Sequence, residues 1–195
     1  MKSLTKFITF SLIIGGMSLA AQAQTDTNED SHALTVTIPE VALLDLEADD
    51  TTSITLEATA PTEAGLAADV NDSDDTIWIN YSSIVNTGED DNRSVTVEIS
   101  AGTVPGGTMI TLGAAAYSGD SGGGDTGTAG AAVTLSGTAQ DIITAIGSCY
   151  TGDGTESGHQ LTYTLALDSS DPDAYSKLDA SDSNTLTVLY TLTDD

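Results

Sequence analysis

Residues 160–167 read Gln-Leu-Thr-Tyr-Thr-Leu-Ala-Leu, and much of the chain repeats their pattern. Apolar side chains recur at every second position with small polar ones between them, which is the period of a β-strand that has one face in a core and the other in water. Strands of antiparallel sheets show this alternation, whereas strands of parallel sheets are apolar almost throughout. The stretch therefore predicts an antiparallel, all-β protein.

The alternation recurs along the chain from Ala33 onward and predicts about eight strands. Polar clusters typical of turns separate these strands, as at residues 71–75 and 105–107. A single Ig-like antiparallel β-sandwich is the most economical architecture for such a set. The predicted strands are 34–38, 54–58, 77–81, 95–99, 109–112, 133–135, 161–167 and 186–192.

Four segments depart from this period. Residues 138–147 hold Thr138 and Asp141 at capping-box spacing, followed by three isoleucines on one helical face and a terminal glycine, so they predict one short helix. Residues 61–68 and 172–178 each predict a single helical turn. The tract 118–130 is rich in Gly, Asp and Thr and predicts a flexible loop.

The first residues read as a secretory signal, with a basic start, an apolar core and an Ala-x-Ala cleavage site at residues 21–23. We expect residues 1–23 to be removed, residues 24–32 to form a flexible acidic leader, and residues 33–195 to form one sandwich domain. The apolar core is interrupted and shorter than the roughly 20 residues of a membrane span. The mature chain is expected to lack an integral membrane segment and to be exported to the periplasm, cell surface or medium.

Acidic residues dominate the charge. The chain has thirty acidic and four basic residues, and loss of two lysines with the signal changes the net charge from −26 to −28. Like charge repels nucleic acid and anionic lipid, so neither is an expected partner. The acidity is explained by solubility in a saline habitat, where ions screen repulsion, or by binding of divalent cations or a cationic partner.

The sequence contains two candidate nucleophiles, Ser121 and Cys149. Residues 119–123 read Gly-Asp-Ser-Gly-Gly, which is similar to the nucleophile segment of chymotrypsin-like serine proteases. The mechanism of those enzymes also needs a histidine base. His32 is the one histidine upstream of this segment, and it lies in the polar leader. Cys149 and His159 are a formal Cys-His pair, yet no nearby cation would stabilise a thiolate. As the single cysteine, Cys149 forms no intrachain disulfide and is expected to be structural. The sequence predicts no enzyme.

A candidate calcium site consists of Asp69, Asn71, Ser73 and Asp75, which fall at alternate positions like the first ligands of a calcium loop. The sixth position is Asp74 where a sharp turn needs Gly, and the twelfth is Asn80 where a bidentate Glu belongs. The two interpretations are a solvated turn and a weak site with a dissociation constant of roughly 10⁻⁴ to 10⁻³ M. Two histidines and one cysteine cannot build a structural zinc site, and no other cofactor is expected.

Trp78 is the candidate interface residue. It lies between Ile77 and Ile79 and so points to the face opposite the core series. An aromatic side chain on a polar face serves as an interface or carbohydrate-stacking residue, or is covered by a loop.

The mature chain resembles secreted bacterial β-sandwich proteins of the pilin-like and WxL-like kind, including small exported proteins of marine Bacteroidetes. The segments that carry the resemblance are 34–39, 78–81 and 186–193. It implies an Ig-like sandwich with a surface, adhesive or filament role. Asn80 stands where WxL domains have Leu, and the cysteine pair of many pilins is missing.

Two functions follow as expectations. The first is a non-enzymatic secreted or cell-surface structural or adhesion protein that assembles through the terminal segments 33–38 and 184–193, since an exposed strand edge is a template for adding another chain. The alternative is an extracellular module that binds calcium or a glycan through the acidic loops or Trp78.

Overall fold

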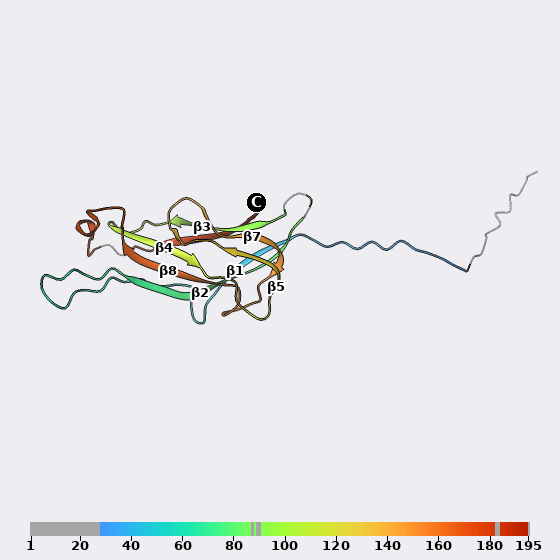
Figure 1. Ribbon diagram of the computed structural model, residues 1–195, viewed down its shortest axis with the longest axis horizontal. Coiled ribbons are helices and arrows are strands. Elements are labelled where there is room, and N and C mark those ends of the chain that lie inside the picture. The colour runs from blue at the N-terminus through green and yellow to red at the C-terminus, as the bar shows by residue number, and fades with distance from the viewer. Residues whose placement is uncertain (1–27, 87, 89–90, 182–183, 195) are drawn as a thin grey trace, which may run out of the picture. The chain divides into compact units, whose positions relative to one another are not determined.

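The computed structural model describes residues 28–86, 88, 91–181 and 184–194 (Figure 1). It divides into two compact units, Met1–Thr37 and Ile38–Asp195. In the first unit, the described residues 28–37 are exposed and form no strand or helix. The predicted signal and its cleavage site lie outside the described residues. Within the described part, no helix is long and apolar enough to cross a membrane.

The second unit is all-β, which confirms the predicted fold class. Its described residues form nine strands, one more than the approximate number predicted, and one 3-10 helix, η1. All the strand pairs are antiparallel. The elements are β1 Val41–Glu47, β2 Asp72–Ile84, β3 Arg93–Ala101, β4 Thr108–Ala114, β5 Gly123–Ala129, β6 Val133–Thr134, β7 Gln140–Tyr150, β8 His159–Leu167, η1 Ala174–Lys177 and β9 Thr187–Asp194.

The strands form one hydrogen-bonded ladder in the order β6-β4-β8-β2-β7-β3-β9, with β1 added to β2 and β5 added to β7. The link between β2 and β7 is short, because only Ser82 and Ser83 pair with it. The ladder therefore has two halves, β6-β4-β8-β2-β1 and β5-β7-β3-β9. The hydroxyls of Tyr163 on β8 and Tyr190 on β9 share a hydrogen bond, so the halves face each other as in a β-sandwich.

The core lies between the two halves and draws on the alternating residues of both. Ile79 and Leu161 come from one half and Val95 and Val97 from the other, and all four are fully buried. Complete burial of such a side chain contributes about 1.5–3 kcal/mol. The two-residue period thus identified the inward-facing positions of these strands.

The predicted helix over residues 138–147 is wrong, because residues 140–147 belong to β7. Its isoleucines Ile142, Ile143 and Ile146 are all buried, as a helical face would be. In β7 the pairing with β3 shifts twice, and Ala145 has a positive φ of 57°. Irregularities of this kind interrupt the alternation of inward- and outward-facing side chains in a strand. The buried positions of β7 therefore have the spacing that a helical face would have.

The predicted flexible loop over residues 118–130 is also wrong, since β5 lies within it and pairs with β7. Its glycines allow the backbone of β5 to lie close to β7. A Cβ at Gly124 would lie 2.2 Å from the Ser148 backbone oxygen, and one at Gly127 would lie 2.6 Å from a carbon of Ile146. Both glycines have positive φ, which L-residues rarely adopt.

Other boundaries differ from the prediction in smaller ways. The helical turn expected at 172–178 is confirmed as η1, whereas the one expected at 61–68 is wrong, because those residues form turns and bends but no helix. The turn expected at 71–75 is instead the start of β2. Residues 54–58 form no strand, although Ile54 and Leu56 pack against the core.

Candidate functional site

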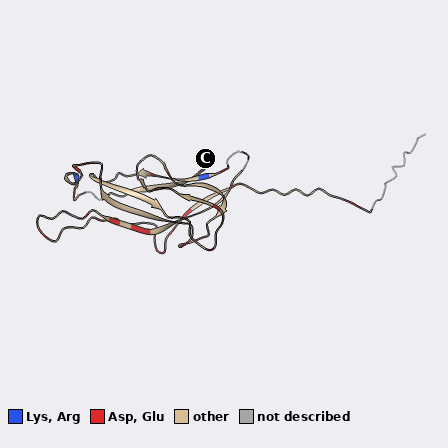
Figure 2. Cartoon of the chain, in the orientation of Figure 1, with Lys and Arg blue, Asp and Glu red and all other residues tan. Residues whose placement is uncertain are grey.

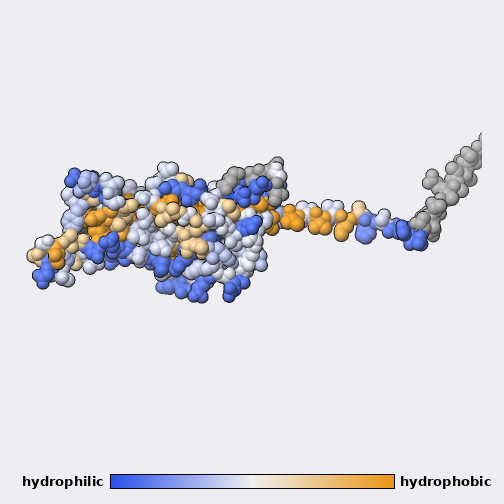
Figure 3. Space-filling view, viewed as in Figure 1, coloured by the Kyte–Doolittle hydropathy of each residue, from blue (hydrophilic) through white to orange (hydrophobic). Residues whose placement is uncertain are grey.

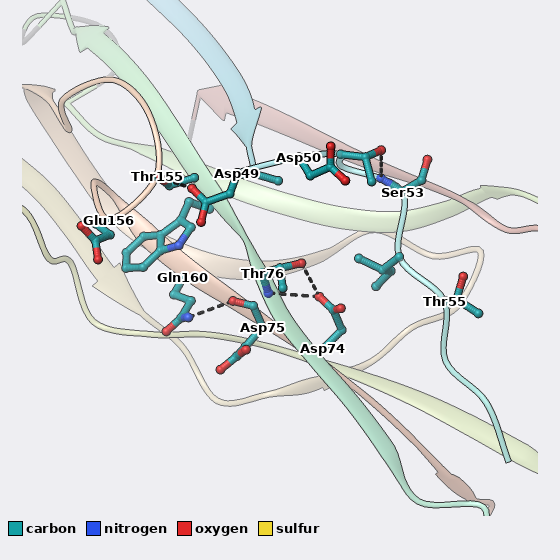
Figure 4. A pocket seen from close by; sticks show the side chains of 14 residues that line it. Asp49, Asp50, Ser53, Thr55, Asp74, Asp75, Thr76, Thr155, Glu156 and Gln160 are labelled. Carbon is teal, nitrogen blue, oxygen red and sulfur yellow. Dashed lines mark hydrogen bonds between the residues drawn. The ribbon is translucent and has the colours of Figure 1, made fainter. Parts of the chain in front are cut away.

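An open cleft of about 520 Å³ lies on the second unit beside Trp78 (Figure 4). Trp78 is partly buried, whereas its neighbours Ile77 and Ile79 are buried in the core, so its side chain is on the opposite face of β2, as predicted. Three parts of the chain line the cleft: residues 48–51 and 53–55, the β2 residues 74–76 and Trp78, and a wall made of Thr155, Glu156 and Gln160.

Hydrogen bonds between distant segments hold these walls together. Trp78 pairs with Glu47 of β1 on one side and with Gln160 of β8 on the other. The Gln160 amide donates to the Asp75 backbone oxygen over 2.8 Å. The Thr155 hydroxyl donates to the Asp49 carboxylate over 2.8 Å, which joins the loop after β7 to the segment after β1. The cleft is therefore a product of the tertiary fold.

Five acidic residues line the cleft, and Figure 2 shows acidic residues in red on β2. Among the residues that the structure describes, no Lys, Arg, His or Cys belongs to the lining. Ionised carboxylates only accept hydrogen bonds, and the face of an indole attracts cations. The arrangement can therefore hold a cationic or polyhydroxylated ligand. Its acidic residues are Asp49, Asp50, Asp74, Asp75 and Glu156.

The four candidate calcium ligands lie along an extended path instead of around a loop. Ser73 and Asp75 are on β2, and Asp69 and Asn71 precede it. The Asp69 carboxylate accepts hydrogen bonds from the Asn71 backbone and side-chain nitrogens at 3.0 and 2.9 Å, and these lower its pKa. Among the described residues, no group of three or more His, Cys, Asp or Glu side chains is arranged to hold a metal ion.

Cys149 is a buried thiol on β7. Burial, with a smaller contribution from the negative charge of Asp125, raises its pKa to about 11. The thiol is therefore protonated at neutral pH, when a nucleophile would have to be a thiolate.

The ring nitrogens of His159 are occupied by other partners. Nδ1 lies 2.8 Å from the Ala115 backbone oxygen, and Nε2 lies 2.8 Å from the Tyr81 hydroxyl and 3.2 Å from the Thr126 backbone oxygen. His159 is fully buried, and burial is also the main cause that raises the pKa of Tyr81. This cluster joins β2, β5 and β8. It was not predicted, and only the place of Tyr81 in the core series pointed to it.

Arg93 is the second feature that the sequence did not predict. Its side chain is 2% exposed, and it forms ion pairs with Glu40, just before β1, and with Asp194 of β9. Its Nη1 also donates to the Val41 backbone oxygen at 2.6 Å and to the Ser83 hydroxyl at 3.1 Å. We call this group of contacts the Arg93 clamp, because it fastens the start of β1 and the end of β9 to β3.

An apolar segment without a strand partner precedes the clamp. Leu34, Val36 and Ile38 are 80%, 76% and 73% exposed, and the segment is visible as an orange stretch of chain in Figure 3. It has the alternation of the predicted strand 34–38, but no described strand pairs with it. At the other terminal segment, Leu189 of β9 is 44% exposed.

The comparisons with known proteins do not identify the chain: no family model, no curated protein and no solved structure matches it.

Proposed function

We propose that the protein is a non-enzymatic, secreted or cell-surface structural or adhesion protein that assembles through exposed strands at its termini. The observation that carries this proposal is the exposure of Leu34, Val36 and Ile38 at strand spacing. Leaving three such side chains in water forgoes about 1.5–3 kcal/mol each relative to burial. A partner strand would cover them and would also pair the backbone groups of the segment.

Charge supports the same proposal. In a chain of net charge −26, residues 33–39 contain no charged side chain. Two copies repel each other through their acidic surfaces, and an uncharged segment is the part that can be buried in a contact without desolvating a carboxylate.

The test compares three forms of the exported chain, residues 24–195, by light scattering across a range of protein concentrations: wild type and two variants. Val36→Asp puts a charge in the exposed apolar segment, and Leu66→Asp puts the same charge at an apolar side chain that is 61% exposed elsewhere. We expect the average molar mass of wild type and of L66D to rise with protein concentration. The molar mass of V36D should stay at the value of the monomer. A wild-type mass that is monomeric throughout would contradict assembly.

The second candidate function is a ligand-binding module, which the acidic cleft beside Trp78 favours. Trp78 is the single tryptophan of the chain, so its fluorescence reports on this cleft alone. Titration with an oligosaccharide or a diamine should shift the emission if the cleft binds either class. Calcium is tested by the melting temperature in millimolar calcium against chelator at matched ionic strength. Equal curves would remove calcium from consideration.

A further inference from the structure

The indole of Trp78 distinguishes the cleft from the rest of the acidic surface. Trp78 is the single tryptophan of the chain, and it lines the cleft on the face of β2 that points away from the core. The face of an indole attracts cations through its quadrupole, and does so more strongly than the ring of Tyr or Phe. The ring therefore offers a flat contact for an organic group, and this contact does not depend on the carboxylates.

A bulge in β2 brings neighbouring side chains to the same cleft. Successive residues of a regular strand point to opposite faces of the sheet. In the pairing with β8, two residues of β2, Asp75 and Thr76, stand opposite Thr162 alone. The extra residue interrupts the alternation, and Asp74, Asp75 and Thr76 all line the cleft although they are consecutive (Figure 4).

Three of the five carboxylates in the cleft are free to bind a ligand. The other two, those of Asp49 and Asp74, accept hydrogen bonds from threonines that also line the cleft. The free carboxylates form no hydrogen bond or ion pair with the part of the chain that the structure describes, and each comes from a different wall. They belong to Asp50, Asp75 and Glu156.

The chain has no cation of its own that compensates this charge. Beyond the first 23 residues, Arg93 and Lys177 are the only arginine and lysine of the sequence. Arg93 is buried in the Arg93 clamp, and Lys177 pairs with Asp171. Neither belongs to the described lining of the cleft. The positive charge that complements the cleft therefore has to come from a ligand.

The spacing of the carboxylates favours an extended cation over a metal ion. Calcium needs about six to eight oxygen atoms around one point. Within the described ranges, no group of three or more His, Cys, Asp or Glu side chains is arranged to hold a metal ion. The cleft volume of about 520 Å³ lies within the range of pockets for small organic molecules. A ligand with several separated charges therefore fits the cleft better than a single ion.

We infer that the cleft binds a linear polyamine, with one ammonium group over the Trp78 indole and the others beside the free carboxylates. The inference rests on the second candidate function and names its ligand class. A neutral oligosaccharide would stack on the indole but would leave the negative charge of the walls uncompensated. A polyamine uses both features of the cleft.

The test is calorimetric titration of the chain of residues 24–195 with spermidine, a linear triamine, at constant ionic strength. The cleft variant removes the three free carboxylates, which hold no other part of the described fold, and combines Asp50→Asn, Asp75→Asn and Glu156→Gln. The control variant removes the same charge from exposed residues outside the lining, and combines Asp120→Asn, Asp141→Asn and Glu63→Gln.

We expect wild type and the control variant to bind spermidine with similar affinity and the cleft variant to bind about tenfold more weakly, because an exposed ion pair contributes up to about fivefold. Trp78→Leu should weaken binding by about twofold to fivefold, the contribution of an exposed cation–π contact. Equal losses in the cleft and control variants would overturn the inference, because net charge alone would then hold the amine.

Two other outcomes separate the ligand class from the function. If spermidine does not bind wild type but an oligosaccharide shifts the Trp78 emission, the ligand-binding module stands and the polyamine is wrong. If neither binds, the second candidate function fails as well.

Discussion

Replacing Arg93 by Met removes a buried cation and keeps most of the apolar stem of the side chain. The guanidinium donates to the Ser83 hydroxyl, to two backbone carbonyls and to the carboxylates of Glu40 and Asp194. Each bond to a neutral acceptor is worth about 1 kcal/mol. The two carboxylates are 52% exposed and regain water when released, so each ion pair adds at most about 1 kcal/mol. We therefore expect R93M to lower the free energy of unfolding by about 3–5 kcal/mol.

Urea unfolding measures this loss, because urea leaves the ionic strength unchanged. With a slope of roughly 2 kcal/mol per molar, the unfolding midpoint of R93M should fall by about 2 M. Lys177→Met is the matched control, since it removes the same charge from an ion pair with Asp171 in which the lysine is 55% exposed. Its midpoint should change by less than about 0.5 M. Equal shifts in the two variants would refute the clamp and leave net charge as the cause.

Two further predictions concern β5 and β7. Gly127→Ala should lower the free energy of unfolding by about 2–3 kcal/mol in the same urea assay, because Gly127 has a φ of +81° and a Cβ there would meet Ile146. The control is Gly154→Ala, which should cost about 1 kcal/mol because Gly154 has a φ of +90° but nothing lies within 4 Å of its Cβ position. Similar losses in the two variants would contradict the close approach of β5 to β7. Cys149 has a pKa raised from 9.0 to about 11, so its contribution to stability is complete below about pH 9 and is lost as the pH rises toward 11. Cys149→Ala should therefore flatten the fall in melting temperature over that window, and an unchanged slope would show that the thiol takes no part in it.

The sequence could predict those parts of the fold in which local alternation and burial agree. Strands β2, β3, β8 and β9 were located because their inward positions repeat every second residue. The pattern failed where tertiary pairing overrides it, as in β7, whose irregular register imitates a helix, and in β5, whose glycines imitate a loop. It failed in the opposite sense at residues 34–38, which have the period of a strand and no described strand to pair with.

The candidate site was predictable only in part, for the same reason. The face that Trp78 occupies follows from its two isoleucine neighbours, but the cleft also needs residues 48–55 and the loop after β7, which pairing between distant segments brings together. The Arg93 clamp joins residues that lie 53 and 101 positions away in the sequence. No local pattern encodes such a contact, and a single arginine in an acidic chain is the one hint that it exists.

The Arg93 clamp also has a mechanical consequence. If copies join as proposed, tension enters each copy through the segment before Glu40 and leaves through β9, which ends at Asp194. Both carboxylates are bound to the same guanidinium, so the tensile load passes from one terminus to the other across a single side chain and the ladder between β3 and β9. The sandwich core then lies beside the load path and would keep its packing while the assembly is stretched.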